Sequence, residues 1–305
     1  MAVGKIRLGG YLPHHPTVSL HDRLRLFREA GFALIGITPE GINAASTNAV
    51  TPHLAHKYGF EIDNVHLTGA GTNKLWLDSP EGEDVLERYC REIRTCAEYG
   101  IKKGITHLTW GSHAPAPAVS DTGIERFRRI ADYAEKHDFT VVLENSITFE
   151  HMEAVFGRVD SDHLAFCWDT GHWSCFTPDY DFMAKYRDRF VCMHLDDNDK
   201  IEDNHLMPYD GAADWEKIKG DLASTKYGSE VLFFELNARV TRSYPGLSAG
   251  EIRQKWIENG VKIAEDEHLV TYRDGAIEAY ANLTYEQYLD RMVKAANRLK
   301  EGLVQ

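Results

Sequence analysis

Short apolar runs alternate along the chain with longer segments whose apolar residues recur at helical spacing. The runs have the length of buried strands, about four to eight residues. The segment 82–100, by contrast, collects apolar side chains on one helical face, namely Val85, Leu86, Tyr89, Ile93 and Ala97. An alternation of this kind is typical of βα units arranged around a parallel sheet.

Eight such runs favour a (β/α)8 TIM barrel over an open sheet. The predicted strands cover 5–12, 32–38, 64–71, 105–111, 139–145, 164–170, 190–197 and 230–237. Helices are predicted over 19–31, 82–100, 122–137, 148–156, 179–189 and 215–224, and a closing helix over 284–303.

The stretch at about 239–283 follows the eighth strand and lies outside the repeating pattern. We expect it to be an elaboration over the barrel mouth or an oligomer contact, since it is too short for a domain of its own. The whole chain, 1–305, is then one barrel domain with this insertion. A homo-oligomer is one state that such a contact would allow.

Composition narrows the class of protein. Hydrophobic residues make up 43% of the 305 residues and charged residues 27%, as in globular chains with a sizeable core. The net charge of −13, from 47 acidic and 34 basic residues, disfavours a nucleic-acid partner because binding phosphates requires a dense basic surface. No apolar run approaches the roughly 18 residues of a transmembrane helix, and neither a signal peptide nor a membrane partner is expected. Five cysteines without a CxxC pair favour a reducing cytoplasm.

Ionisable side chains end each of the last four predicted strands. These residues are Glu144, then Asp169 with His172 three positions later, then His194, and finally Glu235. Because the C-terminal ends of all eight barrel strands meet at one mouth, we expect the side chains to lie close together. Each one alone is most simply a solvated or hydrogen-bonded loop residue. Their occurrence at four successive strand ends points instead to a shared site.

The chemistry of this set predicts a metal ion. Three carboxylates and one imidazole suit Mn²⁺, Mg²⁺ or Co²⁺, with Zn²⁺ as an alternative. Three carboxylates that share a site would repel one another strongly at neutral pH. A divalent cation relieves that repulsion, and we therefore expect one to be required.

The segments around these strand ends resemble the xylose isomerase-like TIM barrel superfamily of sugar isomerases and epimerases. It is also called the sugar phosphate isomerase/epimerase family. The segments are VVLEN (141–145), CWDTGH (167–172), MHLDDN (193–198), DNHLMPYDGAADW (203–215) and FFELN (233–237). The resemblance implies that one divalent ion, Mn²⁺ in the first place, is held by Glu144, Asp169, His194 and Glu235. It also implies that Glu144 and Glu235 are the catalytic pair, which removes and returns a proton next to a carbonyl through an enediolate.

Further residues are expected to contact the substrate. By the same resemblance, His172 and His205 face the barrel mouth. His66 and His113, which we place at the ends of the third and fourth strands, are substrate contacts or structural hydrogen-bonding residues. Trp110 is expected in an aromatic wall of the pocket. The expected partner is a non-phosphorylated sugar or cyclitol.

Two positions depart from the pattern of the superfamily. In its ketose 3-epimerases an arginine usually follows the strand-seven histidine, whereas this chain offers Asp196, Asp197 and Lys200 and no arginine there. Tyr209 replaces the first glycine of a loop that usually reads PGxG. The first departure keeps a lyase of the same superfamily, inosose dehydratase-like or cleaving oxidised C-glycosides, as an alternative.

The order of possible metal ligands in this chain also resembles that of a third class of enzyme. The apurinic endonucleases of the superfamily hold three zinc ions, and a similar order of residues occurs here: His66, His113, Glu144, Asp169, His172, His194, Asp203, His205 and Glu235. The acidic net charge speaks against gripping DNA. We therefore rank a metallohydrolase below the isomerase or epimerase.

Overall fold

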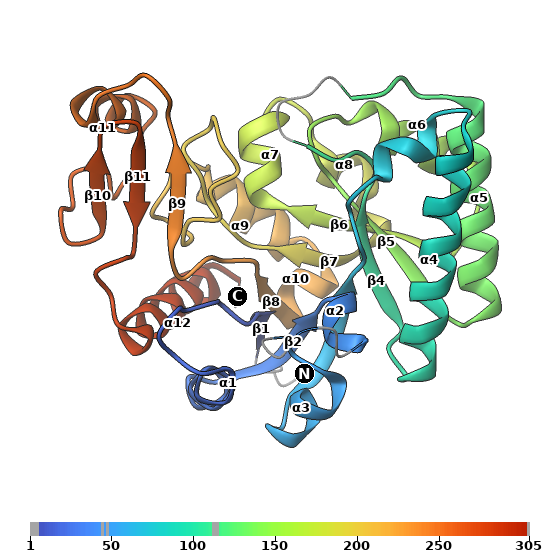
Figure 1. Cartoon of the computed structure of the whole chain (residues 1–305), viewed down its shortest axis with the longest axis horizontal. Coiled ribbons are helices and arrows are strands. Elements are labelled where there is room, and N and C mark those ends of the chain that lie inside the picture. Colours follow the sequence, from blue (N-terminus) through green and yellow to red (C-terminus); the bar gives the residue numbers. More distant parts are fainter. Residues whose placement is uncertain (1–5, 44–45, 47–48, 112–115, 304–305) are drawn as a thin grey trace.

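Eight parallel strands form the centre of the molecule (Figure 1). The structure is a computed structural model, and it describes residues 6–43, 46, 49–111 and 116–303. The strands are β1 (Arg7–Tyr11), β2 (Phe32–Ile37), β3 (Glu61–His66), β4 (Lys103–His107), β5 (Thr140–Glu144), β6 (Leu164–Asp169), β7 (Phe190–His194) and β8 (Val231–Phe234).

The strand order is that of a nearly closed barrel. Each strand from β2 to β7 pairs with its predecessor in the sequence, and β1 also pairs with β8. The remaining gap lies between β7 and β8, where the Leu195 N–H donates to the Phe233 carbonyl oxygen at 2.9 Å. Leu195 and Phe234 also form a parallel bridge. The predicted (β/α)8 TIM barrel is confirmed.

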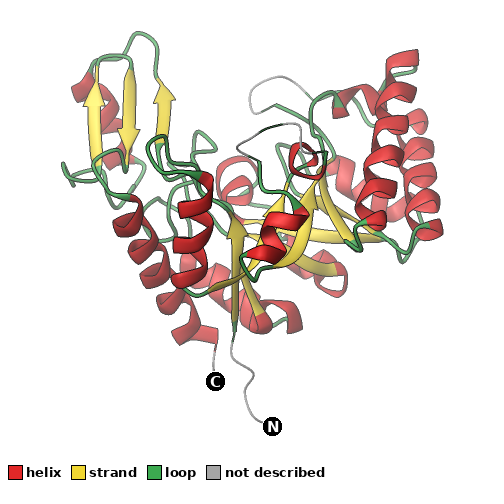
Figure 2. Ribbon diagram, turned by 60° about the horizontal axis from the view of Figure 1, so that its bottom comes forward, coloured by secondary structure: helices red, strands yellow, loops and turns green. Residues whose placement is uncertain are grey.

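Helices surround the barrel (Figure 2). They are α1 (Leu20–Glu29), α2 (Pro39–Ile42), α3 (Pro52–Lys57), η1 (Thr72–Trp76), α4 (Pro80–Glu98), α5 (Asp121–Lys136), α6 (Glu150–Arg158), α7 (Thr170–Phe176), α8 (Phe182–Tyr186), η2 (Arg187–Arg189), α9 (Trp215–Ala223), α10 (Lys226–Glu230) and α12 (Tyr285–Leu303). Ser19 caps α1, because its side chain accepts the Asp22 N–H. On α4, Cys96 is buried, whereas Ala97 of the predicted face is only half-buried.

Glycines in the first two strands make room for large rings inside the barrel. A Cβ on Gly36 would lie 2.4 Å from the Tyr11 ring, and one on Gly9 would lie 2.7 Å from the Phe233 ring. The Tyr11 and Phe233 rings meet edge to face, with centroids 5.4 Å apart. Tyr11 also contacts the His194 ring edge on, at 5.5 Å. These rings thus form the floor beneath the strand-end residues.

The stretch after β8 forms a small sheet of its own beside the barrel (Figure 1). It contains β9 (Val240–Ser243), β10 (Val270–Arg273) and β11 (Ala276–Ala279), paired antiparallel in the order β10-β11-β9, together with α11 (Ala249–Glu258).

Within the described ranges, none of the helices is both long and apolar enough to cross a membrane.

All eight strands end earlier than the sequence predicts, and the difference is largest for β3 and β4. β3 ends at His66 and β4 at His107, whereas the predicted runs continued to residues 71 and 111. After β3 the chain turns through Gly71, whose φ is +82°, into the 3-10 helix η1. The apolar residues beyond each strand, such as Leu67 and Leu108, are buried outside any strand. Apolar run length therefore overestimated both strands.

Candidate metal and substrate site

Four side chains from consecutive strands meet at the mouth of the barrel. Glu144 ends β5, Asp169 ends β6, His194 ends β7 and Glu235 follows β8. One ligand atom from each lies within 4.8 Å of the others. The strand register produces this meeting, since Asp169 pairs with His194 across neighbouring strands. The structure therefore brings together all four residues that were predicted to hold a cation.

The His194 imidazole is the centre of this cluster. Its Nδ1 lies 2.6 Å from Glu144 Oε1, 2.7 Å from Glu235 Oε2 and 3.7 Å from Asp169 Oδ2. The side chains of Glu144, Asp169 and His194 are fully buried, and that of Glu235 is 24% exposed. One imidazole nitrogen cannot donate its single hydrogen to three carboxylates at once.

The donor set fits a divalent cation. Ligands at right angles on an ion with bonds of about 2.1 Å lie about 3 Å apart, close to the spacings observed here. Asp169 Oδ2 is buried and has no hydrogen-bond partner among the described residues. An unpaired buried carboxylate oxygen is costly, and a bound ion would satisfy it. The four residues are thus suited to holding one divalent ion.

Neighbouring charges set the protonation of the cluster. Burial acts against the charge of Glu144, but the His194 and His107 imidazoles outweigh it and hold its pKa well below the usual range. Burial likewise opposes a charge on His194, yet the Glu144 and Glu235 carboxylates raise its pKa well above the usual value. Burial, with a contribution from Glu144, raises the pKa of Asp169 to about 7. The cluster therefore favours bound positive charge, for which protons and a metal ion compete.

Two further histidines contact Glu144 from β3 and β4. His107 Nε2 lies 2.9 Å from Glu144 Oε2, and His66 Nε2 lies 3.4 Å from the same oxygen. The imidazole at the end of β4 is therefore His107, which was not predicted, whereas the predicted His113 lies outside the described residues. The alternation of side chains along a strand could have identified His107. It lies two residues after Ile105, which packs inside the barrel, so both side chains face the same side of the strand.

A third group of ligand atoms lies beside the first. Asp203 Oδ2 is 3.2 Å from His172 Nε2 and 3.1 Å from His205 Nε2. His205 Nδ1 is also 3.3 Å from Asp196 Oδ2. His172 Nδ1 lies 2.9 Å from the Asn145 carbonyl oxygen and donates to it, which leaves Nε2 to face Asp203. His172 and His205 thus face the mouth as predicted, and Asp203 joins them.

The position of His172 follows from the start of α7. Asp169 is the N-cap of this helix, and its Oδ1 accepts the His172 N–H at 2.5 Å. The spacing of three residues that distinguishes the pair in the sequence is therefore a capping geometry. It directs one oxygen of Asp169 to the helix and leaves the other for the cluster.

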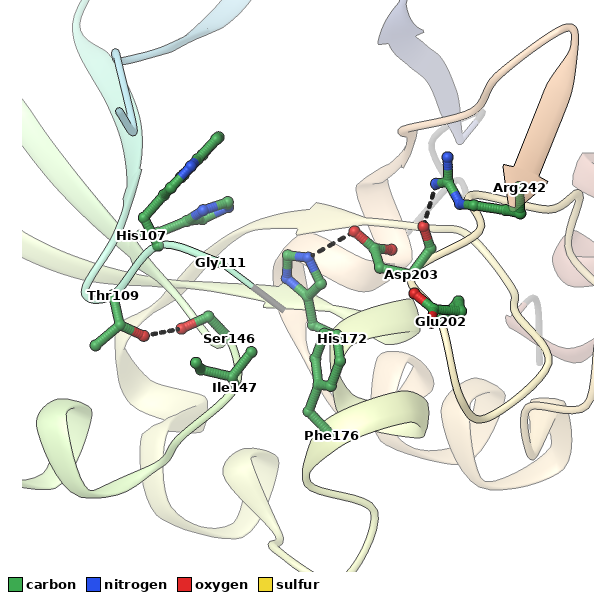
Figure 3. Close-up of a pocket in the computed structure, with 11 residues that line it drawn as sticks. His107, Thr109, Gly111, Ser146, Ile147, His172, Phe176, Glu202, Asp203 and Arg242 are labelled. Atoms are coloured by element: carbon green, nitrogen blue, oxygen red, sulfur yellow. Dashed lines mark hydrogen bonds and ion pairs between the residues drawn. The ribbon is translucent and has the colours of Figure 1, made fainter. Parts of the chain in front are cut away.

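A pocket of about 340 Å³ opens beside these groups (Figure 3). It is lined by His107, Thr109, Trp110, Gly111, Ser146, Ile147, His172, Phe176, Glu202, Asp203 and Arg242. His107 and His172 belong both to the pocket and to the ligand groups, so a molecule in the pocket would lie next to the cluster. Arg242 comes from β9, which shows that the extra sheet contributes to the barrel mouth. The volume of the pocket falls within the range of small-molecule sites.

The Tyr209 position shows how the loop without its usual glycine folds. Tyr209 has a φ of +74°, in the left-handed region that glycine adopts most readily. Its ring packs 3.8 Å below the Arg298 guanidinium and 5.1 Å from the Trp215 ring. These contacts favour the strained backbone, so the loop keeps a left-handed residue here despite the substitution.

The sequence comparisons identify the family. The model of the family described as xylose isomerase-like TIM barrel matches residues 24–262. The chain therefore belongs to this family, which confirms the resemblance seen in the strand-end motifs. A curated relative, the uncharacterized protein y4fM of Sinorhizobium fredii (strain NBRC 101917 / NGR234), is 33% identical over 96 residues. That match covers 31% of this chain and 31% of the relative.

Solved structures share the fold. A D-psicose 3-epimerase with D-tagatose from Clostridium cellulolyticum H10 aligns at a TM-score of 0.68 and 12% identity, covering 98% of this chain and 100% of that one. The IolI protein with a bound zinc atom aligns at 0.65 and 13% identity, with coverages of 98% and 100%. A 3-keto-D-glucoside 4-epimerase from E. coli, in its apo form, aligns at 0.59 and 16% identity, with coverages of 76% and 92%. At these identities the likeness concerns the fold alone.

Proposed function

We propose that this protein is a divalent-metal-dependent isomerase or epimerase that acts on a keto-sugar or cyclitol. The observation that carries the proposal is the cluster of Glu144, Asp169, His194 and Glu235, whose ligand atoms lie within 4.8 Å of one another beside an open pocket. When bound there, a divalent ion, Mn²⁺ in the first place, would act as a Lewis acid that polarises a carbonyl. The fold shared with sugar epimerases supports the substrate class.

The two glutamates would move the proton. Burial raises the pKa of Glu235, but the His194 and His205 imidazoles outweigh it and bring the pKa to about 2. With the pKa of Glu144 also held low, either carboxylate is ionised at neutral pH and can accept a proton from carbon. Proton return to the opposite face gives an epimer, and return to the adjacent carbon gives an isomer.

His107 is placed to orient the Glu144 carboxylate. Its Nε2 lies 2.9 Å from Glu144 Oε2, within hydrogen-bonding distance. Burial lowers the pKa of His107, which favours the neutral imidazole. The N–H of that ring would donate to Glu144 and hold the carboxylate in place for proton transfer. We place the protein in the cytoplasm, with a small sugar or cyclitol as its partner.

Solvent exchange in D₂O tests the proposed reaction. Protein loaded with Mn²⁺ would be incubated with D-fructose, D-psicose, D-tagatose and scyllo-inosose, and the recovered sugars examined by NMR. We expect deuterium at the carbon next to the carbonyl of at least one substrate, because proton removal there is the first step. Chelated protein is the control and should show no exchange. Net loss of water would instead support a dehydratase, and absence of exchange from every ketone would contradict the proposal.

A second candidate, a phosphodiester hydrolase with several metal ions, is favoured by one observation. Two more groups of ligand atoms flank the first, namely His66, His107 and Glu144 on one side and Asp196, Asp203 and His205 on the other. In such a site paired ions would stabilise the attacking and leaving oxygens. The net charge of −13 opposes a nucleic-acid substrate, so this function ranks below the isomerase or epimerase.

Metal stoichiometry separates the two candidates. We expect one tightly held ion per chain by plasma mass spectrometry after dialysis, and no cleavage of a duplex that contains an abasic site. In an isomerase, the His66→Gln variant should keep that ion, because His66 lies outside the four-residue cluster. Three ions per wild-type chain, with loss of one in His66→Gln and with cleavage of the duplex, would establish the hydrolase instead.

A further inference from the structure

The pocket beside the cluster has a rigid aromatic face. Trp110 is 46% exposed, and its indole stacks on the His107 ring with centroids 5.4 Å apart and an interplanar angle of 26°. The Asn73 side chain fixes the main chain of Trp110 with two hydrogen bonds. Its Oδ1 accepts the Trp110 N–H and its Nδ2 donates to the Trp110 carbonyl oxygen, each at 2.8 Å. A Cβ on Gly69 would lie 2.2 Å from the indole, so glycine is needed there.

A large apolar side chain that is held rigidly and yet exposed is suited to binding. Most exposed apolar residues need no explanation, but this one is stacked on an imidazole that contacts Glu144. The indole face is electron-rich and attracts the weakly positive C–H groups on the flat side of a sugar ring. Trp110 therefore offers a platform next to the reacting centre.

Arg242 lies across the pocket from this platform. Figure 3 shows it on the opposite side of the pocket from His107 and Thr109. Its guanidinium donates to the main-chain oxygen of Asp203, and to that of Thr241 at 3.3 Å. Arginine has five N–H donors in one plane, so these two bonds hold the group in place and leave donors for a ligand.

The remaining lining residues indicate an uncharged ligand with several hydroxyl groups. Thr109 and Ser146 hydroxyls hydrogen-bond to each other at 3.1 Å on the pocket wall. The Glu202 and Asp203 carboxylates line the pocket near Arg242, and they would repel an added phosphate or carboxylate. Arg242, the two carboxylates and the two hydroxyls around an aromatic platform match the hydroxyl-rich edge of a neutral ring.

We infer that Trp110 and Arg242 form a clamp that holds the non-reacting part of an uncharged substrate in its ring form, a cyclic sugar or a cyclitol. Trp110 stacks on the flat face of the ring, and Arg242 binds its hydroxyl oxygens. The inference rests on the proposed function for the presence of a sugar-like substrate. It adds that the sheet of β9, β10 and β11 carries a specificity residue, since Arg242 belongs to β9.

Binding without turnover tests the clamp. Titration calorimetry on the Mn²⁺-loaded protein would use myo-inositol, which is a ring without a carbonyl, and D-glucitol, its open-chain counterpart. We expect myo-inositol to bind at least tenfold more tightly than D-glucitol, because only a ring presents a flat face to the indole. Trp110→Ala and Arg242→Gln should each weaken the binding of myo-inositol about tenfold. Trp110→Phe and Arg242→Lys should recover part of the loss.

The control variant is Arg239→Gln, since Arg239 precedes β9 and pairs with Glu278 at 3.5 Å outside the pocket. It should bind myo-inositol like the wild type. With scyllo-inosose in D₂O, Arg242→Gln should raise KM about tenfold and change kcat less than threefold, as expected of a positioning residue.

Several results would overturn the clamp. They are a failure of myo-inositol to bind, equal binding of D-glucitol, unchanged affinity in both Trp110→Ala and Arg242→Gln, or tighter binding of a phosphorylated inositol. Failure of the proposed function has a different signature. In that case myo-inositol binds and depends on Trp110 and Arg242, while no ketone exchanges deuterium.

Discussion

Replacing Glu235 by glutamine is expected to lower the rate of deuterium exchange by about 10²–10⁴-fold, the usual contribution of a general base. Glutamine has nearly the same shape and retains an oxygen that can face the cation. It cannot accept a proton from carbon. Glu235 is also the least buried residue of the cluster, with 24% of its side chain exposed, so the substitution disturbs packing little. The measurement is the initial rate of exchange by NMR with the best ketone substrate.

The matched control is Glu278→Gln. Glu278 lies on β11, pairs with Arg239, and has a side chain that is 21% exposed, so its exposure is close to that of Glu235 while it lies outside the cluster. This control should exchange at the wild-type rate. The metal content of each variant must be measured, because loss of the ion would lower the rate for another reason. Exchange within tenfold of wild type, at full metal content, would show that Glu235 is not a proton carrier.

The barrel was predictable from the sequence because its interior imposes a regular pattern. Strands buried on both faces read as continuous apolar runs, and such runs mark β2, β5, β6, β7 and β8. Asp169 and His194 interrupt such runs where the chain leaves the barrel, and they proved to be cross-strand neighbours. Period and polarity together therefore located the four-residue cluster.

The extra sheet gave no comparable signal. Its strands are four residues long, and β9 has one buried position, Val240, beside exposed or half-buried ones. Such strands are defined by their pairing partners rather than by their own pattern. For the same reason, Arg242 could not be placed at the mouth from the sequence. The missing arginine after the strand-seven histidine gave no indication that an arginine from β9 would reach the pocket.

Strand periodicity did not place two further residues of the site, Asp203 and His107, for physical reasons. Asp203 lies in the irregular stretch after β7, where no periodicity relates sequence position to direction. Its closeness to His172 and His205 depends on a loop that folds back over the mouth. His107 was overlooked because the apolar run continues to Leu108, beyond the end of the strand. The strand β4 ends at His107 although the next residue, Leu108, is still apolar and buried, so hydrophobicity did not indicate the end of the strand.

Removing the cation is expected to lower the melting temperature by about 5–8 °C and readdition of Mn²⁺ to restore it. An ion present at 100 to 1,000 times its dissociation constant stabilises the folded state by about 2.7–4.1 kcal/mol. One kcal/mol corresponds to about 2 °C in a chain of this size. Without the ion, the buried carboxylates of Glu144 and Asp169 lie near Glu235 with only imidazoles to offset their charge. Differential scanning calorimetry with and without EDTA measures the shift.

The chelator effect should grow with pH, because protons replace the ion at low pH. Burial opposes a charge on His194, but Glu144 and Glu235 raise its pKa in the folded state well above the usual value. A raised histidine pKa contributes stability that is complete below about pH 6.5 and is lost as pH rises through the folded-state pKa. The ion-free protein should therefore be less stable at pH 9 than at pH 6. The Asp169→Asn variant, which lacks one ligand, should respond less to EDTA at either pH. An unchanged melting temperature after verified removal of the ion, at pH 9, would show that these carboxylates do not depend on a cation.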